Sequence, residues 1–165
     1  MSTSQDRAEI HLDRRGRARM VDVSAKSSTA REAVARCLVR MSKETVTAFR
    51  EGRLSKGDAL AVARVAGILA AKRTSDLLPL CHPLNITHAQ IDLDPVDDPC
   101  GIRIVATVRC QGQTGVEMEA LTAAAVSGLA LIDMGKSLDR GIWVESLELV
   151  RKSGGRSGLW QRESG

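Results

Sequence analysis

A long uncharged segment in the second half of the chain carries charged residues only at its two ends. Glu117 and Glu119 precede it, Asp133 and Lys136 follow it, and residues 120–132 hold no charge. Asp133 and Lys136 are three positions apart, so they share a face of the helix that this segment predicts. An acid and a base held together are candidates for proton transfer to and from a substrate. A simple ion pair on a helix surface is the alternative.

The acids at the front of this helix lie far from the pair at its end. Glu119 precedes Asp133 by 14 residues, which puts it roughly 21 Å away along a helix axis. One compact substrate could hardly touch both ends, so we expect two sites, or one site completed by another subunit. Glu117 has a second interpretation, because Thr114 and Glu117 match a capping box at the helix start.

The segment "LCHPL" places Leu80, Cys81 and His82 beside prolines, in a stiff stretch without regular structure. An imidazole titrates near neutral pH, and rigid loops of this kind often line pockets. A catalytic or substrate-binding role is one interpretation, and a purely structural histidine is the other.

Two further segments could bind an anion. "KSGGRSG" has cations at Lys152 and Arg156 around small residues whose backbone could approach a ligand, as in an anion-binding nest. It lacks the pattern of a Walker loop, and a flexible tail is the alternative. Lys56, in "LSKGD", lies just before a predicted helix start and could present its ammonium group there.

Composition narrows the class of protein. The 165 residues are 43% hydrophobic, with a net charge of +4, one Phe, two Trp and no Tyr. Scarce aromatic residues disfavour a site that stacks single-stranded nucleic acid. No apolar run resembles a signal peptide or reaches the ~20 residues that span a bilayer. The four cysteines form no C-x-x-C pair, so we expect free thiols, no zinc site and a cytoplasmic location.

Residue patterns predict an α+β fold. The order is a strand from residue 33 to 41, helices after Ser42 and Asp58, a hairpin with a long loop at "DPVDDPCG", a long helix stopped by Gly141, and a strand from about 142 to 150. This approaches β-α-β-β-α-β, a ferredoxin-like antiparallel sheet with helices packed on one face. The apolar helices exceed what one small sheet covers, which favours a homo-oligomer over a well-filled monomer.

The motifs in their order closely resemble one known family. "MVDVSAK", "KGDALAVARVAGILAAKRTSDLLPLCHPL", "GQTGVEMEALTAAAVSGLALIDMGKSLDR" and "KSGGRSG" are similar to the cyclic pyranopterin monophosphate synthases, the MoaC family of molybdenum cofactor biosynthesis. The resemblance implies a catalytic domain at 20–158, between a basic N-terminal arm at 1–19 and a tail at 159–165. The arm could attract a polyanion or simply be solvated.

The resemblance also implies an activity. The family converts 3′,8-cyclo-7,8-dihydroguanosine 5′-triphosphate to cyclic pyranopterin monophosphate and releases pyrophosphate, as phosphorus–oxygen lyases. Its members are hexamers, trimers of dimers, with active sites between subunits. Proton transfers without redox change need no redox cofactor. A divalent metal ion could help to neutralise the triphosphate, although no ligand cluster in the sequence requires one.

Site residues carry over position by position. The implied catalytic residues are Asp133, Lys136 and Lys56. The implied substrate-binding residues are Leu80, Cys81, His82, Met118, Glu119, Lys152 and Arg156. Arg156 stands where the family often has lysine, which keeps the charge and adds a planar fork suited to phosphate. Gly135 stands where the family has cysteine. The alternative class is a non-catalytic, basic oligomer that binds nucleotides or RNA; a steep salt dependence of RNA binding would distinguish it.

Overall fold

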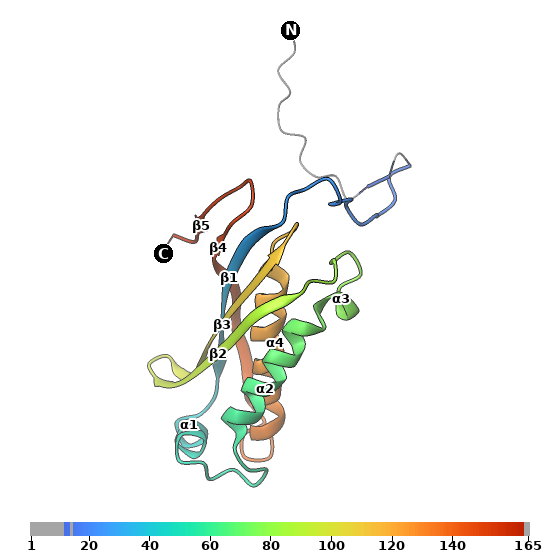
Figure 1. Ribbon diagram of the computed structural model, residues 1–165. Helices are drawn as coiled ribbons and strands as arrows, with labels where there is room; N and C mark the ends of the chain where they lie inside the picture. The colour runs from blue at the N-terminus through green and yellow to red at the C-terminus, as the bar shows by residue number, and fades with distance from the viewer. Residues whose placement is uncertain (1–11, 14, 164–165) are drawn as a thin grey trace.

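Nine helices and strands make up the part of the chain that the structure describes, residues 12–13 and 15–163 of this computed structural model. In chain order they are β1 (Thr29–Arg40), α1 (Lys43–Arg50), α2 (Ala59–Lys72), α3 (Thr74–Leu77), β2 (Ile86–Asp97), β3 (Cys100–Gly112), α4 (Glu117–Gly135), β4 (Trp143–Ser153) and β5 (Trp160–Gln161). Figure 1 shows their arrangement.

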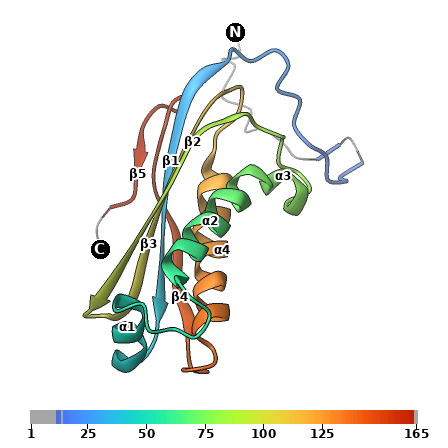
Figure 2. The same cartoon turned by 60° about the horizontal axis from the view of Figure 1, so that its bottom comes forward.

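The strands form one antiparallel sheet in the order β2-β3-β1-β4-β5. Helices α2 and α4 lie side by side over one face of it, and α1 lies at one end (Figure 2). The first four strands and the two long helices have the connectivity of a split β-α-β fold. The predicted ferredoxin-like α+β class, with helices on one face, is confirmed.

Small aliphatic side chains fill the space between sheet and helices. The alternating residues of β1 from Ala33 to Val39, and of β3 from Ile102 to Cys110, are all at most 3% exposed. Where α2 crosses α4, the Ser127 hydroxyl donates to the Ala63 carbonyl at 3.0 Å. A Cβ at Gly67 would fall on that hydroxyl. The small residues therefore let the two helix backbones approach closely.

Two predicted helix starts are confirmed, whereas one short helix and the end of α4 differ from the prediction. Ser42 and Asp58 accept hydrogen bonds from Thr45 N and Ala61 N, as capping residues do. The four-residue α3 was not predicted. Helix α4 ends at Gly135 rather than just before Gly141.

The early end of α4 and the missing capping box have local causes. Asp139 accepts hydrogen bonds from Gly141 N at 2.8 Å and Ser42 N at 3.0 Å, which fixes a turn where the helix would otherwise continue. At the other end, Val116 is the N-cap and makes no side-chain cap bond. The predicted capping box is therefore wrong: Glu117 is the first helical residue, too early to reach back, and its carboxyl group lies over Gly115.

The β2–β3 hairpin also departs from the sequence expectation. The strands pair as far as Asp97 and Cys100, so the turn is two residues rather than a long loop. At the other end of β2, Ile86 pairs with Cys110 and His88 with Arg109, which leaves Thr87 as an extra residue. This bulge turns Thr87 outward, out of phase with Ala89, Ile91 and Leu93, which face the helices.

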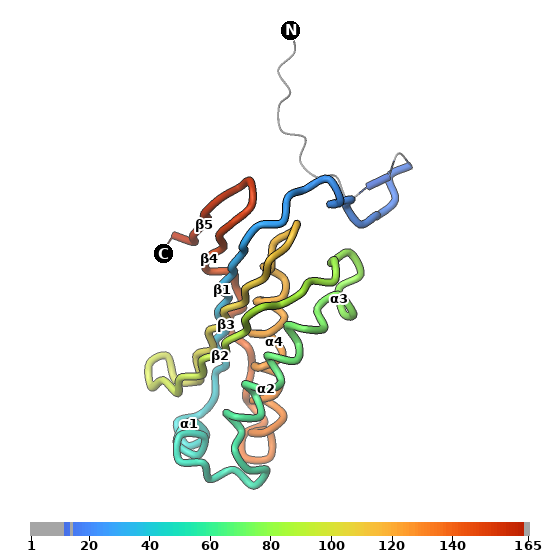
Figure 3. The backbone as a smooth tube through the Cα atoms, in the orientation of Figure 1, coloured from blue at the N-terminus to red at the C-terminus, as the bar shows by residue number. Residues whose placement is uncertain are grey.

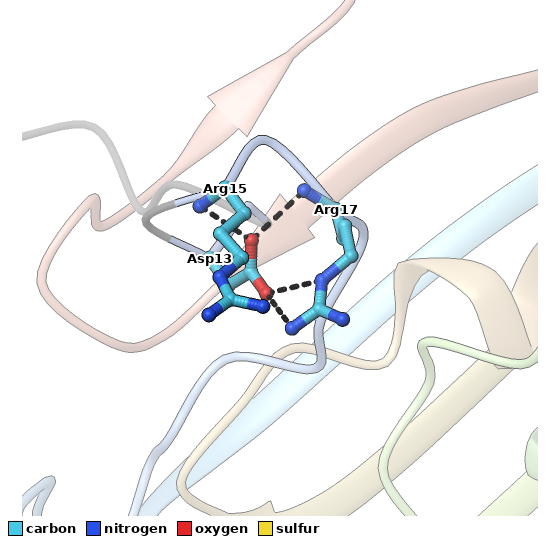
Figure 4. A network of polar contacts seen from close by, with 3 residues as sticks. All are labelled: Asp13, Arg15 and Arg17. Atoms are coloured by element: carbon cyan, nitrogen blue, oxygen red, sulfur yellow. Dashed lines mark hydrogen bonds and ion pairs between the residues drawn. The ribbon is translucent and has the colours of Figure 1, made fainter.

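Near the N-terminus, Asp13 organises a small turn (Figure 4). Its carboxylate accepts hydrogen bonds from the backbone of Arg15 and Arg17 and from the Arg17 guanidinium, at 2.8–3.0 Å. Part of the positive charge of the predicted basic arm is thus paired within the arm. The rest of that arm, residues 1–11 and 14, lies outside the described residues, as do residues 164–165 of the tail.

The C-terminal tail contains the edge strand β5, which pairs with β4 through Arg151 and Lys152. The two tryptophans lie near opposite ends of β4: Trp143 at its start, and Trp160 in β5, opposite Lys152. Trp143 is 50% exposed and lies 5.6 Å from the Arg40 guanidinium; Trp160 is 41% exposed and lies 5.9 Å from that of Arg162. These contacts are cation–π pairs on the surface.

Helices α2 and α4 leave large apolar side chains on the surface. Val62, Val65 and Leu69 on α2 are 46–56% exposed, and Leu129 on α4 is 59% exposed. Among the described residues, α4 alone is long and apolar enough to cross a membrane, yet half of that stretch is buried in the protein. Its apolarity reflects contact with the sheet and with α2.

Candidate active site

Three charged side chains meet at the C-terminal end of α4. Asp133 Oδ1 lies 2.7 Å from Lys136 Nζ, and Asp133 Oδ2 lies 3.0 Å from Lys56 Nζ. Lys56 comes from the loop before α2 and also donates to the Asp133 backbone carbonyl at 2.7 Å. The structure therefore brings together all three residues predicted to be catalytic, including one from a distant part of the chain.

The two lysines keep Asp133 ionised. The hydrogen bond from Lys136, and then that from Lys56, hold the pKa of Asp133 below its usual value. All three side chains are 40–60% exposed, so the ion pairs contribute little to stability. The cluster carries one net positive charge, and each carboxylate oxygen already has a donor. It is thus arranged to orient two ammonium groups toward an anionic or electron-rich substrate.

A second group of predicted residues lines one cavity at the opposite end of α4. This cavity has a volume of about 320 Å³, and five of its lining residues were predicted to bind substrate: Leu80, Cys81, His82, Met118 and Glu119. The "LCHPL" segment follows α3, while Met118 and Glu119 belong to the first turn of α4. The cavity thus lies between the start of the long helix and the proline-bounded loop.

Glu119 is the most unusual titratable group in this cavity. It is 4% exposed, and burial, with a smaller contribution from the charge of Glu117, raises its pKa to about 7. Burial and the nearby Glu119 also raise the pKa of the Cys81 thiol. A carboxyl group that titrates near neutral pH can either donate or accept a proton.

A larger, basic cavity of about 1100 Å³ adjoins the first one. The two share Thr114, Gly115 and Glu117 in their lining. Its cations are Lys26, Arg31 and Arg156. Of the predicted tail cations, Arg156 lines the cavity directly, whereas the Lys152 ammonium is hydrogen-bonded to the Ser157 hydroxyl at its rim.

Sequence reasoning missed Lys26 and Arg31. Lys26 lies within "MVDVSAK", which contributed to the resemblance but was given no role. Arg31 precedes the residues from which the first strand was predicted, but it is in phase with the buried Ala33, and its pairing opposite the buried Cys110 places it on the helix side of the sheet. The signal that could have identified them is a pair of cations spaced around a small-residue run, "KSSTAR".

The two ends of α4 remain separate within one chain. Figure 3 shows α4 running along the sheet beside α2, with the loop before α2 near one end of it. Fourteen residues separate Glu119 from Asp133, or roughly 21 Å of helix. Within one chain, Lys56 therefore lies far from the cations of the C-terminal segment, Lys152 and Arg156. Among residues 12–13 and 15–163, no three His, Cys, Asp or Glu side chains are grouped to hold a metal ion.

The protein combines a ferredoxin-like sheet with a buried carboxyl group that titrates near neutral pH and with an adjoining basic cavity. These features define a small α+β protein equipped for acid–base chemistry on an anionic compound. A family model, the MoaC family, matches residues 20–155. The chain belongs to the MoaC family.

Curated relatives agree with this assignment. The chain is 57% identical to a protein of Chloroflexus aurantiacus over 92% of this chain and 93% of the relative. It is 54% identical to one of Thermomicrobium roseum over 93% and 92%, and 51% identical to one of Brucella abortus over 91% of each. All three relatives are named cyclic pyranopterin monophosphate synthase. The alternative of a non-catalytic nucleotide- or RNA-binding oligomer is not favoured.

Proposed function

We propose that this protein is a cyclic pyranopterin monophosphate synthase of molybdenum cofactor biosynthesis. It would convert 3′,8-cyclo-7,8-dihydroguanosine 5′-triphosphate to cyclic pyranopterin monophosphate and pyrophosphate. The observation that carries the proposal is the junction of a basic cavity with a smaller one that contains Glu119. The names of the relatives support the same reaction.

Each cavity suits one part of such a substrate. The triphosphate would occupy the basic cavity, where Lys26 and Arg156 supply positive charge. The guanine-derived rings would occupy the cavity beside Cys81, His82 and Glu119, whose partly apolar walls limit access of water. The shared lining at Gly115 lets one molecule extend through both.

The reaction requires proton transfers at several positions. Closure of the cyclic phosphate forms a bond from a sugar hydroxyl oxygen to the α-phosphorus and breaks the bond from that phosphorus to pyrophosphate. The hydroxyl proton must pass to a base, and the leaving pyrophosphate is stabilised by cations. Glu119 can exchange protons on the ring side, and the Lys56–Asp133–Lys136 cluster can supply ammonium groups. None of these steps needs a redox cofactor, although a divalent cation could accompany the triphosphate.

The separation of the two residue groups supports an active site shared between subunits. In that arrangement, the Asp133 end of one chain faces the Glu119 end of its neighbour. The exposed apolar side chains of α2 and α4, such as Val65 and Leu129, would be covered in a homo-oligomer. We propose the hexameric trimer of dimers of the family. We also propose that the protein is cytoplasmic. Its four cysteines are free thiols, and free thiols persist in a reducing compartment.

The direct test is incubation of the purified protein with the cyclised dihydroguanosine triphosphate. Equal amounts of pyrophosphate and pterin product are expected. Binding of the substrate without release of pyrophosphate would contradict the proposed reaction.

Subunit mixing tests the shared site. Asp133→Asn and Arg156→Ala would each lose activity alone. Hetero-oligomers formed by dissociating and reassociating the two variants should regain about a quarter of the wild-type activity, because random pairing gives that share of intact sites. A mixture of wild type with the Asp133→Asn/Arg156→Ala double variant is the control for exchange. No recovery despite proven exchange would place both residues in one chain's site.

A further inference from the structure

Asp139 joins the turn that follows α4 to the start of α1. Its Oδ2 accepts a hydrogen bond from the Ser42 N–H at 3.0 Å and another from the Thr45 hydroxyl at 3.3 Å. Its Oδ1 accepts a hydrogen bond from the Gly141 N–H at 2.8 Å. The bond from the Ser42 backbone is the main cause that holds the pKa of Asp139 below its usual value, so the carboxylate stays charged and its bonds are charge-assisted.

The same two helices also pack against each other where α4 ends. Helix α1 lies at that end of the molecule (Figures 1 and 2). A Cβ at Gly135, the last residue of α4, would lie 3.0 Å from the Phe49 ring and 2.7 Å from Ile142 Cδ1. Phe49 is buried and belongs to the last turn of α1. The last turn of α4 is therefore packed on α1 without space for a side chain at Gly135.

Helix α1 leads directly to Lys56. After the helix, the Arg53 N–H donates to the Ala48 carbonyl at 2.9 Å, and the Gly57 N–H donates to the Leu54 carbonyl at 3.1 Å. The Leu54 side chain is 9% exposed, which anchors this loop in the core. Lys56 lies within the turn that Leu54 and Gly57 close, so its position follows that of α1.

The other two members of the charged cluster follow α4. Asp133 is in the last turn of this helix, and Lys136 is its C-cap residue. Asp139 comes three residues after Lys136. The separation between Lys56 and Asp133 therefore depends on how α1 is held against the end of α4.

The ion pairs within the cluster are too weak to fix this geometry by themselves. All three side chains are 40–60% exposed, and exposed ion pairs contribute little energy. Asp139 is half-buried, and two of its three donors are backbone N–H groups of the segments that it joins. The stronger restraint on the cluster thus lies at the junction of α1 with α4.

We propose that Asp139 is a positioning residue, which holds the end of α4 on α1 and thereby keeps the two lysine ammonium groups of the cluster on either side of Asp133. Asp139 lines neither of the two cavities described above, and its three bonds are all to protein groups. It acts through the cluster and not through contact with a substrate. The consequence for catalysis rests on the proposed function.

Trace labelling of lysine amino groups with acetic anhydride, measured by mass spectrometry on the full chain, tests this role without substrate. In Asp139→Asn the side chain keeps its shape, but its NH2 group faces a backbone N–H from which it cannot accept a hydrogen bond. An amine held against a carboxylate keeps its proton and reacts slowly. Lys56 should therefore be labelled about twofold to fivefold faster in the variant, the range that loss of an exposed ion pair allows. Lys72, exposed at the end of α2, is the internal reference.

Asp97→Asn is the matched control. Asp97 also contacts α1, through Arg50 at 3.1 Å, but it joins α1 to β2 at the surface. This variant should leave the labelling of Lys56 unchanged. Unchanged labelling in Asp139→Asn, or an equal increase in Asp97→Asn, would overturn the proposal.

A second variant keeps the test decisive if circular dichroism shows that Asp139→Asn does not fold. Thr45→Val removes one hydrogen bond to Asp139 with little change in volume. It should raise the labelling of Lys56 in the same direction and to a smaller extent. No increase in a folded Thr45→Val protein would then contradict the proposal.

Steady-state kinetics distinguishes positioning from a general effect on stability. Asp139→Asn should lower kcat by about tenfold or more and change KM less than about twofold, because small displacements of catalytic groups slow the chemical step. A purely structural role would lower the melting temperature but leave both kcat per folded molecule and the labelling of Lys56 as in the wild type, and that result would refute positioning.

The two measurements also separate this proposal from the proposed function. Labelling requires no turnover, so the response of Lys56 to Asp139→Asn decides the positioning role even in a protein that releases no pyrophosphate from the cyclised substrate. Faster labelling with unchanged kcat would support the hold of Asp139 on the cluster and would refute a catalytic role for the cluster.

Discussion

Replacing Glu119 by glutamine should make the fold less sensitive to alkaline pH. The buried carboxyl group has a pKa of about 7 in the folded protein and an ordinary value of 4.5. Between these values the folded state binds more protons than the unfolded state, so the free energy of unfolding falls as pH rises. Glutamine has a similar shape and stays neutral, so the variant lacks this loss.

The magnitude follows from the size of the pKa shift. The shift from 4.5 to about 7 corresponds to about 3 kcal/mol at 1.36 kcal/mol per unit. This stabilisation is fully present well below the pKa of 4.5 of the unfolded chain, and it is fully lost well above the pKa of about 7 of the folded protein. The stability difference between Glu119→Gln and wild type should therefore increase by up to about 3 kcal/mol in favour of the variant from pH 5 to pH 8. Any constant effect of the amide on packing adds an offset without a pH dependence.

Urea denaturation followed by far-ultraviolet circular dichroism at several pH values measures this difference, at one protein concentration because assembly affects apparent stability. Asp133→Asn is the control. The Asp133 carboxyl group is exposed and its pKa is lowered, so its effect on stability should stay constant above pH 5. A flat pH dependence of the difference for Glu119→Gln would refute the argument that burial keeps this carboxyl group protonated.

Three other outcomes follow from the described contacts. Asp133→Asn should change the melting temperature only as much as the loss of a surface ion pair does, but it should lower turnover by ~10²-fold or more. A near-normal rate would show that Asp133 is not a catalytic residue. Gly67→Ala should destabilise the fold by ~1–3 kcal/mol, because its methyl group would meet Ser127 and the Ala123 carbonyl; unchanged urea stability would show that the helices can move apart. Sedimentation at micromolar concentration should show a species larger than a dimer, and a monomer alone would contradict the proposed assembly.

Local signals in the sequence predicted much of the fold. Ser42 and Asp58 cap the helices that follow them because their side chains accept backbone N–H groups within three residues. The alternation of Ala33 to Val39 predicts β1 because its period places one set of residues against the helices. These effects depend on neighbouring residues only, so no knowledge of the tertiary structure is needed.

The remaining features depend on contacts between distant segments. The end of α4 is set by Asp139, which accepts a hydrogen bond from Ser42, 97 residues away. The bulge at Thr87 depends on the register with β3. The sequence predicted the distance between Glu119 and Asp133 from helix geometry. It could not show that Arg31 faces the C-terminal loop, because that contact requires the β1–β4 pairing.

The position of the two tryptophans determines what a common spectroscopic probe can report. They are the only tryptophans, and the chain has no tyrosine, so intrinsic fluorescence comes almost entirely from the two ends of β4: Trp143 at its start, and Trp160 of β5, which pairs near its end. The Arg162 guanidinium lies over the indole ring of Trp160, which belongs to the two-residue β5. The Arg162 Nε donates to the Leu149 carbonyl at 2.9 Å. So short an edge strand can separate locally before the sheet unfolds. With Trp143 replaced by phenylalanine, an emission change that precedes the loss of circular dichroism would then signal release of the C-terminal edge at Trp160, close to the loop that lines the basic cavity.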